Sequence, residues 1–356
     1  MARRNSRGYR GYQGRRNGSS MALKIIVALL AILLVLGILF VIILGKYVEY
    51  TDNGVRLNLP WNQTNEPDEP GHSDQLIIVT EEPTPSSEPD RIGAIGALEV
   101  TASQVKDGSA ARLAAEAEGN ALVVEVKNAY GKLVWQSENE RAAALRVNAA
   151  DNEFARAVAT LAGEDDLYLV ARVCCFRDQA LASAGIGGPL MTRGGNVWYD
   201  SGGLRWVSPA SPEVRDYLTA LCAELSRMGF DEILLDCAGY PDLGEVHVLA
   251  TDDRRPEDLS TPVSAFYAQV AEALADSGTI LSIQATEQMT QLPGEIVYSG
   301  IIPSVLARYA GRVWLPEELS AEHYTALLGA AGLEEPEKHL VVENGEKESG
   351  SWYVTG

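Results

Sequence analysis

The chain has 356 residues and a net charge of −20, from 29 basic and 49 acidic residues. Its first 24 residues contain seven basic residues and no acidic one, so the remainder has 22 basic against 49 acidic residues, a net charge of −27. Such acidity argues against nucleic-acid binding by the main body of the chain. The 46% hydrophobic content excludes global disorder, and four cysteines are too few for a disulfide scaffold.

An unbroken apolar segment, residues 25–44, follows the basic tail. Its length matches a hydrocarbon core of about 30 Å at about 1.5 Å per residue. We predict an uncleaved transmembrane helix, with a cleaved signal peptide as the alternative. The positive charges then hold residues 1–24 in the cytoplasm and place the rest outside the cell. RNA binding by this Arg-, Gly- and Tyr-containing tail is the alternative to its role in topology.

Three further regions follow the predicted helix. Residues 45–61 form a short juxtamembrane segment with strand-like patterning. Residues 62–90 are dense in Pro, Glu, Asp and Ser, which predicts a disordered, extended linker because such a segment buries too little apolar surface to fold. Residues 91–356 contain no comparable linker and should form one domain.

Apolar runs of strand length alternate with helical patterns through this domain. The predicted strands are Ile92–Val100, Ala121–Lys127, Leu167–Phe176, Glu232–Cys237, Thr279–Ala285, Ile296–Ser299, Arg312–Leu315 and His339–Glu343. The predicted helices are 103–118, 151–162, 212–228, 261–276, 303–310 and 317–331. Ser211-Pro212 and Thr261-Pro262 are each typical of a helix start. Eight strands alternating with helices predict an α/β fold of the (β/α)₈ TIM-barrel type, with a doubly wound open sheet as the alternative.

In such a barrel the chemistry lies where the strands end, and several predicted strand ends or following loops carry carboxylates. Pairs of carboxylates are what glycosidic bond hydrolysis requires. The candidates for catalysis are Asp236, Glu125, Asp178 and Glu287; Glu99 and Glu343 also stand at strand ends. The alternative is that they are ordinary acidic surface residues.

Asp236 is the first choice, because it ends the apolar strand GFDEILLD. Strand alternation predicts Asp236 on one side and Cys237 on the other. Arg172, on the preceding strand, is the expected partner of Asp236, either as part of a site or as a purely structural ion pair. Lys127 and Arg172 are the predicted residues that orient substrate or tune charge.

The long segment between the third predicted strand and Pro212 contains GGNVWYDSGGLRWVSP, which predicts a β-hairpin over the barrel mouth. Trp198, Trp206 and Tyr240 are the predicted sugar-binding aromatic residues, and the alternative for the tryptophans is a small core under the loop. The four histidines lack metal-ligand spacing, and no phosphate-binding glycine loop is present, so we predict neither a metal nor a cofactor. The cysteines fit small core residues.

Three blocks resemble a bacterial family of glycoside-hydrolase-like (β/α)₈ barrels, often tethered outside the membrane. They are ALVVEVKNAYGKLVW, LYLVARVCCFRDQALA and WVSPASPEVRDYLTALCAELSRMGFDEILLDCAGYP. Asn128 stands where the family has an acid, and Cys237-Ala238-Gly239 lacks the family's Arg. The resemblance implies an extracytoplasmic glycoside hydrolase acting on a cell-wall or extracellular polysaccharide. The alternative is a catalytically degenerate barrel that binds glycan or protein.

Overall fold

The structure, a computed structural model, describes residues 48–51, 54–57, 93–164, 167–242, 244–286, 299–347 and 350–355. Strands β1 (Val48–Thr51) and β2 (Gly54–Leu57) form an antiparallel pair joined at Thr51 and Gly54. This pair belongs to a different unit of the chain from the main domain, and each is described by itself.

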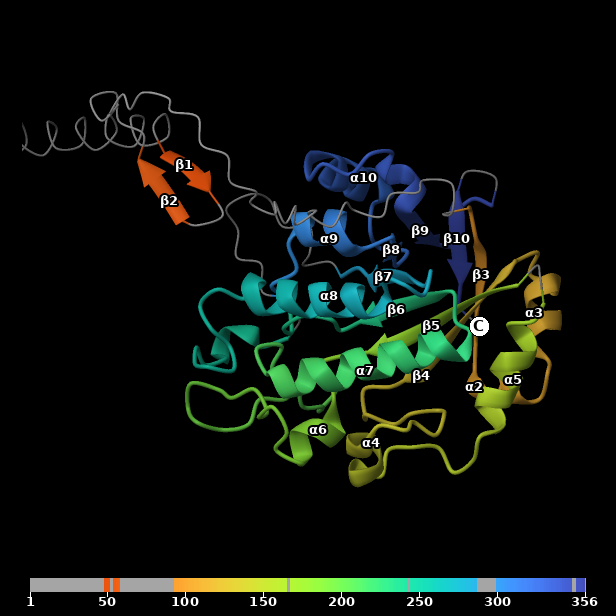
Figure 1. The fold of residues 1–356 in the computed structure, drawn as a ribbon, viewed down its shortest axis with the longest axis horizontal. Helices are drawn as coiled ribbons and strands as arrows, with labels where there is room; N and C mark the ends of the chain where they lie inside the picture. The colour runs from red at the N-terminus through yellow and green to blue at the C-terminus, as the bar shows by residue number, and fades with distance from the viewer. Residues whose placement is uncertain are drawn as a thin grey trace, which may run out of the picture. The chain divides into compact units, whose positions relative to one another are not determined.

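The main domain is a closed, all-parallel barrel (Figure 1). Around the barrel the order is β10-β3-β4-β5-β6-β7-β8-β9. The strands are β3 (Gly96–Val100), β4 (Ala121–Lys127), β5 (Tyr168–Cys174), β6 (Glu232–Asp236), β7 (Ile280–Gln284), β8 (Arg312–Leu315), β9 (Leu340–Glu343) and β10 (Ser351–Val354). Because β10 pairs with both β3 and β9, the sheet has no edge, and the predicted (β/α)₈ barrel is confirmed over the open sheet.

One predicted strand is wrong. Ile296–Ser299 was expected between β7 and β8, but those two strands pair directly with each other. Residues 296–298 lie outside the described residues. The barrel is completed instead by β10, whose four residues SWYV carry too short an apolar pattern to stand out in the sequence.

Helices separate most of the strands, and α7 and α8 lie side by side along the outside of the barrel (Figure 1). They are α2 (Ala102–Lys106), α3 (Ala110–Glu116), α4 (Glu140–Leu145), α5 (Glu153–Leu161), α6 (Gln179–Ser183), α7 (Pro212–Met228), α8 (Ser260–Leu274), α9 (Pro303–Tyr309) and α10 (Ala321–Ala330). The helix predicted over 103–118 is divided at Gly108, whose φ of +77° does not fit a helix. The short helices α4 and α6 were not predicted.

The two predicted helix starts have different outcomes. Ser211 caps α7 as expected, since its Oγ accepts a hydrogen bond from the Val214 amide at 3.4 Å. At α8 the predicted cap, Thr261, lies inside the helix. Asp258 serves this end instead, accepting hydrogen bonds from the Ser260 and Thr261 hydroxyls at 2.7 and 2.6 Å.

Apolar side chains on the strands form two cores. The inward-facing set fills the barrel with small and large residues, including Ala97, Val123, Val170, Leu234 and Trp314. The outward-facing set packs against the helices as a much larger core. This two-sided burial explains why the strands read as continuous apolar runs.

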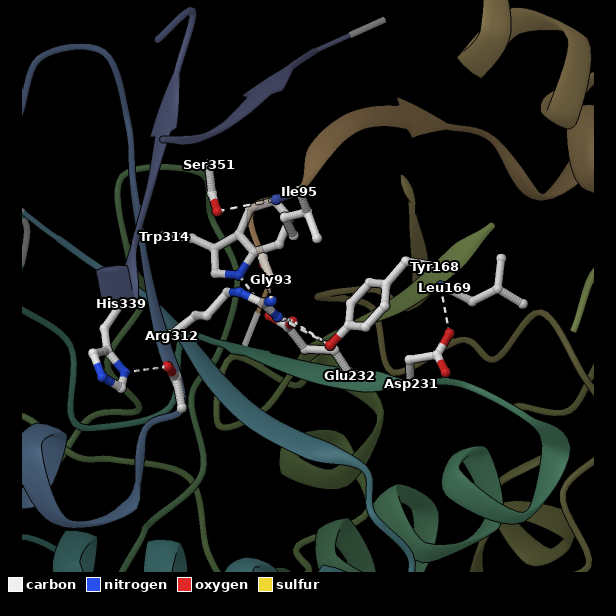
Figure 2. Close-up of polar contacts among 11 residues, drawn as sticks. Gly93, Ile95, Tyr168, Leu169, Asp231, Glu232, Arg312, Trp314, His339 and Ser351 are labelled. Carbon is white, nitrogen blue, oxygen red and sulfur yellow. Dashed lines mark hydrogen bonds and ion pairs between the residues drawn. The ribbon is translucent and has the colours of Figure 1, made fainter. Parts of the chain in front are cut away.

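The amino-terminal end of the barrel is closed by a buried ion pair (Figure 2). Arg312 and Glu232, the first residues of β8 and β6, are 1% and 0% exposed and bond to each other. Glu232 also accepts hydrogen bonds from the Trp314 indole at 2.7 Å and from the Tyr168 hydroxyl at 3.0 Å. Arg312 donates to the Gly93 carbonyl at 2.9 Å. These contacts tie strands β5, β6 and β8 together across the interior.

Within the described residues, no helix is both long enough and apolar enough to cross a membrane. The apolar run 25–44, the flanking basic tail and the linker 62–90 lie outside those residues.

Candidate active site

The inner face of the barrel changes from apolar to polar at the carboxyl ends of the strands. On each strand the residue two positions beyond an interior apolar residue points to the same side. Interior residues such as Val123, Val170 and Leu234 are therefore followed by polar ones. The resulting ring at the barrel mouth consists of Glu99, Glu125, Arg172, Asp236, Gln284 and Glu343.

Arg172 is the cation of this ring, and its partner differs from the one expected. Its guanidinium makes a bidentate contact with Glu99, at 2.6 and 3.1 Å, and not with Asp236. Both side chains are about one quarter exposed or less, at 21% and 24%. Asp236 and Glu125 still lie close enough to interact electrostatically with Arg172. Arg172 thus stands among three carboxylates rather than in a single pair.

Glu125 and Asp236 flank Arg172 from the two neighbouring strands. Glu125 pairs in register with Arg172, and Asp236 pairs with Cys174 on the same strand. The Glu125 side chain is exposed to the mouth, yet partial burial raises its pKa. The Arg172 charge opposes that increase, while the charges of Asp236 and Glu99 add to it. Asp236 is partly buried, and one carboxylate oxygen accepts a hydrogen bond from the Cys237 amide at 2.7 Å.

Asp242, in the loop after β6, is a mouth carboxylate that the sequence reasoning missed. It is 9% exposed, and burial raises its pKa. The Thr286 hydroxyl donates a hydrogen bond to it, and Asp236 lies close enough to add to the rise in pKa. The only signal in the sequence was an acid directly after the Tyr240-Pro241 turn. A second acid of this kind enlarges the set of candidates near Asp236.

Two predicted site residues, Lys127 and Asp178, form a buried pair with each other. Their side chains are 0% and 1% exposed and lie 2.8 Å apart. Lys127 also donates to the Cys174 carbonyl at 2.6 Å, and Asp178 caps α6 by accepting from the Leu181 amide at 2.8 Å. Although burial opposes it, the Asp178 charge raises the pKa of Lys127. A group without access to substrate cannot transfer a proton to it, so this pair holds the end of β4 against β5 and α6.

The predicted aromatic binding residues are also buried. Trp198 is 2% exposed and donates to the Glu245 carbonyl, and Trp206 is 8% exposed and donates to Asp200. Tyr240 is 1% exposed. These positions support the alternative of a small core under the loop for Trp198 and Trp206.

The loop itself is not a regular hairpin. Residues 189–191 form isolated bridges with Val197 and Val207, and Arg177 bridges to Trp206. The turn closes where the Asp200 amide donates to the Leu204 carbonyl at 3.0 Å. Glu287, the remaining predicted catalytic residue, lies outside the described residues.

Cys237 departs from the strand alternation expected of it. Its φ is +48°, a conformation that residues with a side chain rarely adopt. This turn brings the Cys237 thiol to the side of Asp236, within 4.8 Å of the Asp236 carboxylate and the Cys174 thiol. The prediction that Asp236 and Cys237 face opposite sides is therefore wrong. The backbone leaves the extended conformation one residue earlier than the apolar pattern suggested.

Comparison with solved structures gives the same fold. The PgaB (BpsB) glycoside hydrolase domain from Bordetella bronchiseptica has a TM-score of 0.50 and 11% identity, over 73% of this chain and 93% of that domain. A hypothetical protein from Ruminiclostridium thermocellum has a TM-score of 0.45 and 23% identity, over 52% of this chain and 96% of that one. The exo-β-N-acetylglucosaminidase from Vibrio harveyi has a TM-score of 0.44 and 12% identity, over 70% of this chain and 41% of that enzyme. No curated protein matches the chain.

At the level of sequence families, the match covers the barrel from β3 to the segment after β7. The family described as "Putative glycosyl hydrolase domain" matches residues 97–293, more than half of the chain. This range contains the three sequence blocks and the mouth residues Glu99, Glu125, Arg172 and Asp236. The chain therefore belongs to this glycosyl hydrolase domain family, as the resemblance of the blocks predicted.

Proposed function

We propose that the barrel hydrolyses glycosidic bonds of a cell-wall or extracellular polysaccharide, with Asp236 and Glu125 as the reacting carboxylates. The observation that carries the proposal is the ring of acids around Arg172 at the carboxyl ends of β3, β4, β5 and β6. In barrels of this type the active groups stand at this end. Membership of a glycosyl hydrolase domain family supports the same reaction class.

The spacing of the two acids suits a two-carboxylate mechanism. Glu125 and Asp236 belong to strands on either side of β5. Adjacent strands lie about 4.8 Å apart, so the two backbone positions are separated by about 10 Å, and inward-pointing side chains converge from there. Hydrolysis with inversion uses carboxyl groups about 6.5–9.5 Å apart, and retention about 5–5.5 Å. The structure thus brings a second carboxylate within the reach that Asp236 requires.

The local electrostatics supports a division of roles. Burial raises the pKa of Glu125, which favours a protonated carboxyl that can donate to the leaving group. Asp236 then acts as the base or nucleophile. The Arg172–Glu99 pair positions Glu125 and limits how far its pKa rises, since the charge of Arg172 favours the ionised carboxylate. We assign Lys127 and Asp178 a positioning role behind β4.

The location of the substrate is part of the proposal. The apolar run 25–44 behind seven basic residues supports a single-pass anchor with a cytoplasmic amino terminus, and the acidic segment 62–90 supports a spacer that holds the barrel away from the membrane. External protease added to intact cells should then degrade the barrel but spare an epitope placed in residues 1–24. Protection of both parts would contradict this topology.

The test of activity compares the full-length chain, purified in detergent, with Asp236→Asn and Glu125→Gln. We expect reducing sugar to be released from one member of a panel of wall and capsular polysaccharides. Each substitution should lower kcat by about 10²–10⁴-fold, the usual contribution of a general acid or base. Glu116→Gln, which changes an exposed acid on α3, is the matched control and should leave kcat unchanged. Turnover unaffected by Asp236→Asn would contradict the site assignment.

A second candidate function is glycan or protein binding without turnover. It is favoured by Asn128 and Gly239, which replace an acid and the Arg expected from the family resemblance, and by the burial of Trp198 and Trp206. Under this reading the wild-type chain would retain a polysaccharide in a pull-down assay, release no sugar, and bind equally well with Asp236→Asn.

A further inference from the structure

We infer that Cys174, Asp236 and Cys237 form a binding site for a thiophilic divalent cation such as Zn²⁺ at the barrel mouth. Two thiol sulfurs and a carboxylate oxygen from these residues all lie within 4.8 Å of one another. Neither the proposed hydrolysis nor the packing of the core uses the two thiols together. The site brings together adjacent strands β5 and β6, where Cys174 and Asp236 are register partners.

The donor set indicates the class of metal. Thiolates select Zn²⁺ and other thiophilic ions over Mg²⁺ and Ca²⁺, which prefer oxygen donors. Zn²⁺ binds sulfur at about 2.3 Å and carboxylate oxygen at about 2.0–2.2 Å, which places tetrahedral donors about 3.5–3.8 Å apart. The three donors therefore need to approach by only about 1 Å, a movement within the range of side-chain rotation.

The backbone supports this arrangement at a cost that packing alone does not explain. A non-glycine residue with a φ of +48° is strained, and such strain concentrates at functional positions. Without this turn, strand alternation would direct the Cys237 thiol away from Asp236. With it, the Cys237 thiol interacts with both the Cys174 and Asp236 side chains.

Access and charge are also suitable. Asp236 and Cys237 are partly exposed, whereas Cys174 is 3% exposed, so the open coordination position faces the mouth. Two thiolates and one carboxylate around a divalent ion leave one net negative charge. The guanidinium of Arg177 lies close enough to interact electrostatically with both cysteines and offsets that charge, while its own ion pair with Asp200 holds it in place.

Metal binding would have a consequence for the proposed reaction. The ion would occupy the carboxylate of Asp236, and a metal-bound carboxylate is unavailable as base or nucleophile. Zn²⁺ should therefore inhibit hydrolysis reversibly. This consequence rests on the proposed function, whereas the binding itself does not.

The experiment titrates the reduced, metal-free full-length chain with Zn²⁺ in competition with a chromophoric chelator, and with Cd²⁺ while recording thiolate-to-metal charge-transfer absorption. We expect one ion per chain and a charge-transfer band. Cys174→Ser and Cys237→Ser should each weaken binding by more than the roughly 10–100-fold that changes outside the first coordination shell cause. Cys222→Ser is the matched control: this buried cysteine of α7 lies outside the cluster, and its substitution should leave binding unchanged.

A further variant protects the test against misfolding. Cys237→Gly removes the thiol and suits a positive φ, so it should fold yet bind Zn²⁺ weakly. Absence of Zn²⁺ binding by the wild-type chain, equal binding by both serine variants, or a Cys174–Cys237 disulfide in protein purified without reductant would overturn the inference. Metal binding is recorded without substrate, so its failure is distinguishable from failure of the proposed hydrolysis, and a chelator-reversible loss of sugar release links the two.

Discussion

The two ends of the barrel interior solve the problem of burying charge in opposite ways. At the amino-terminal end, one acid and one base, Glu232 and Arg312, are both buried and bond directly to each other. At the carboxyl-terminal end, Arg172 is surrounded by Glu99, Glu125 and Asp236, and all four side chains reach solvent. The base of the barrel is balanced and dry, whereas the mouth carries excess negative charge and is wet.

The difference separates stability from chemistry. A buried pair whose oxygens are already occupied by Trp314 and Tyr168 has no capacity left for a substrate. At the mouth, neighbouring acids repel each other and hold a carboxyl such as Glu125 near protonation, which is the state that proton transfer to a substrate needs. Similar residue types in one barrel thus serve different purposes because solvent and stoichiometry differ.

The largest effect on stability should come from breaking the base. Arg312→Met leaves Glu232 buried without its cation and should lower the free energy of unfolding by about 3–5 kcal/mol. Denaturant unfolding followed by circular dichroism measures this loss. The double variant Glu232→Gln/Arg312→Met should recover much of it, because no unpaired charge remains. A loss below 1 kcal/mol for Arg312→Met would contradict the comparison.

A smaller effect is expected from the corresponding change at the mouth. Arg172→Met removes the cation beside Glu99, but both groups are partly exposed, so the free energy of unfolding should fall by only about 1 kcal/mol. The activity should respond differently: without this charge, the pKa of Glu125 rises further, and the alkaline limb of the pH profile of kcat/KM should move to higher pH. A stability loss equal to that of Arg312→Met would erase the distinction between the two ends.

The smallest effect is a pH dependence of stability. Because burial raises the pKa of Glu125 in the folded chain, its proton is held more tightly there than in the unfolded chain. The contribution of Glu125 to stability is then present at low pH and is lost as pH rises from the unfolded pKa through the folded pKa. Relative to Glu125→Gln, the wild-type chain should become less stable between about pH 4 and pH 7. The opposite slope in denaturant unfolding at several pH values would show that Glu125 gains a stabilising partner instead.

Much of the fold could be predicted because its signals are local. The bounds of β4, β8 and α7 match the predicted ranges, since a run of apolar side chains or a Ser-Pro start acts within a few residues. The closing strand β10 could not be predicted in the same way. It is four residues long, and it is a strand only because β3 and β9 stand ready on either side.

The site divides along the same line. The ends of strands could be located from the sequence, which directed attention to Glu125 and Asp236. Their surroundings could not be. Arg172 bonds to Glu99 across β4, Lys127 and Asp178 remove each other from the mouth, and Trp198 and Trp206 face the interior of the loop. Partners of this kind come from distant parts of the chain.

The sequence by itself determined an alternating strand and helix pattern, its family and the carboxylates at the strand ends, because apolar periodicity and short motifs depend on neighbours in the chain. Tertiary structure alone decided which charges are paired, which are buried and where the Cys237 thiol points. Solvent exposure and the distance between charged groups set those outcomes, and both arise only when the barrel closes.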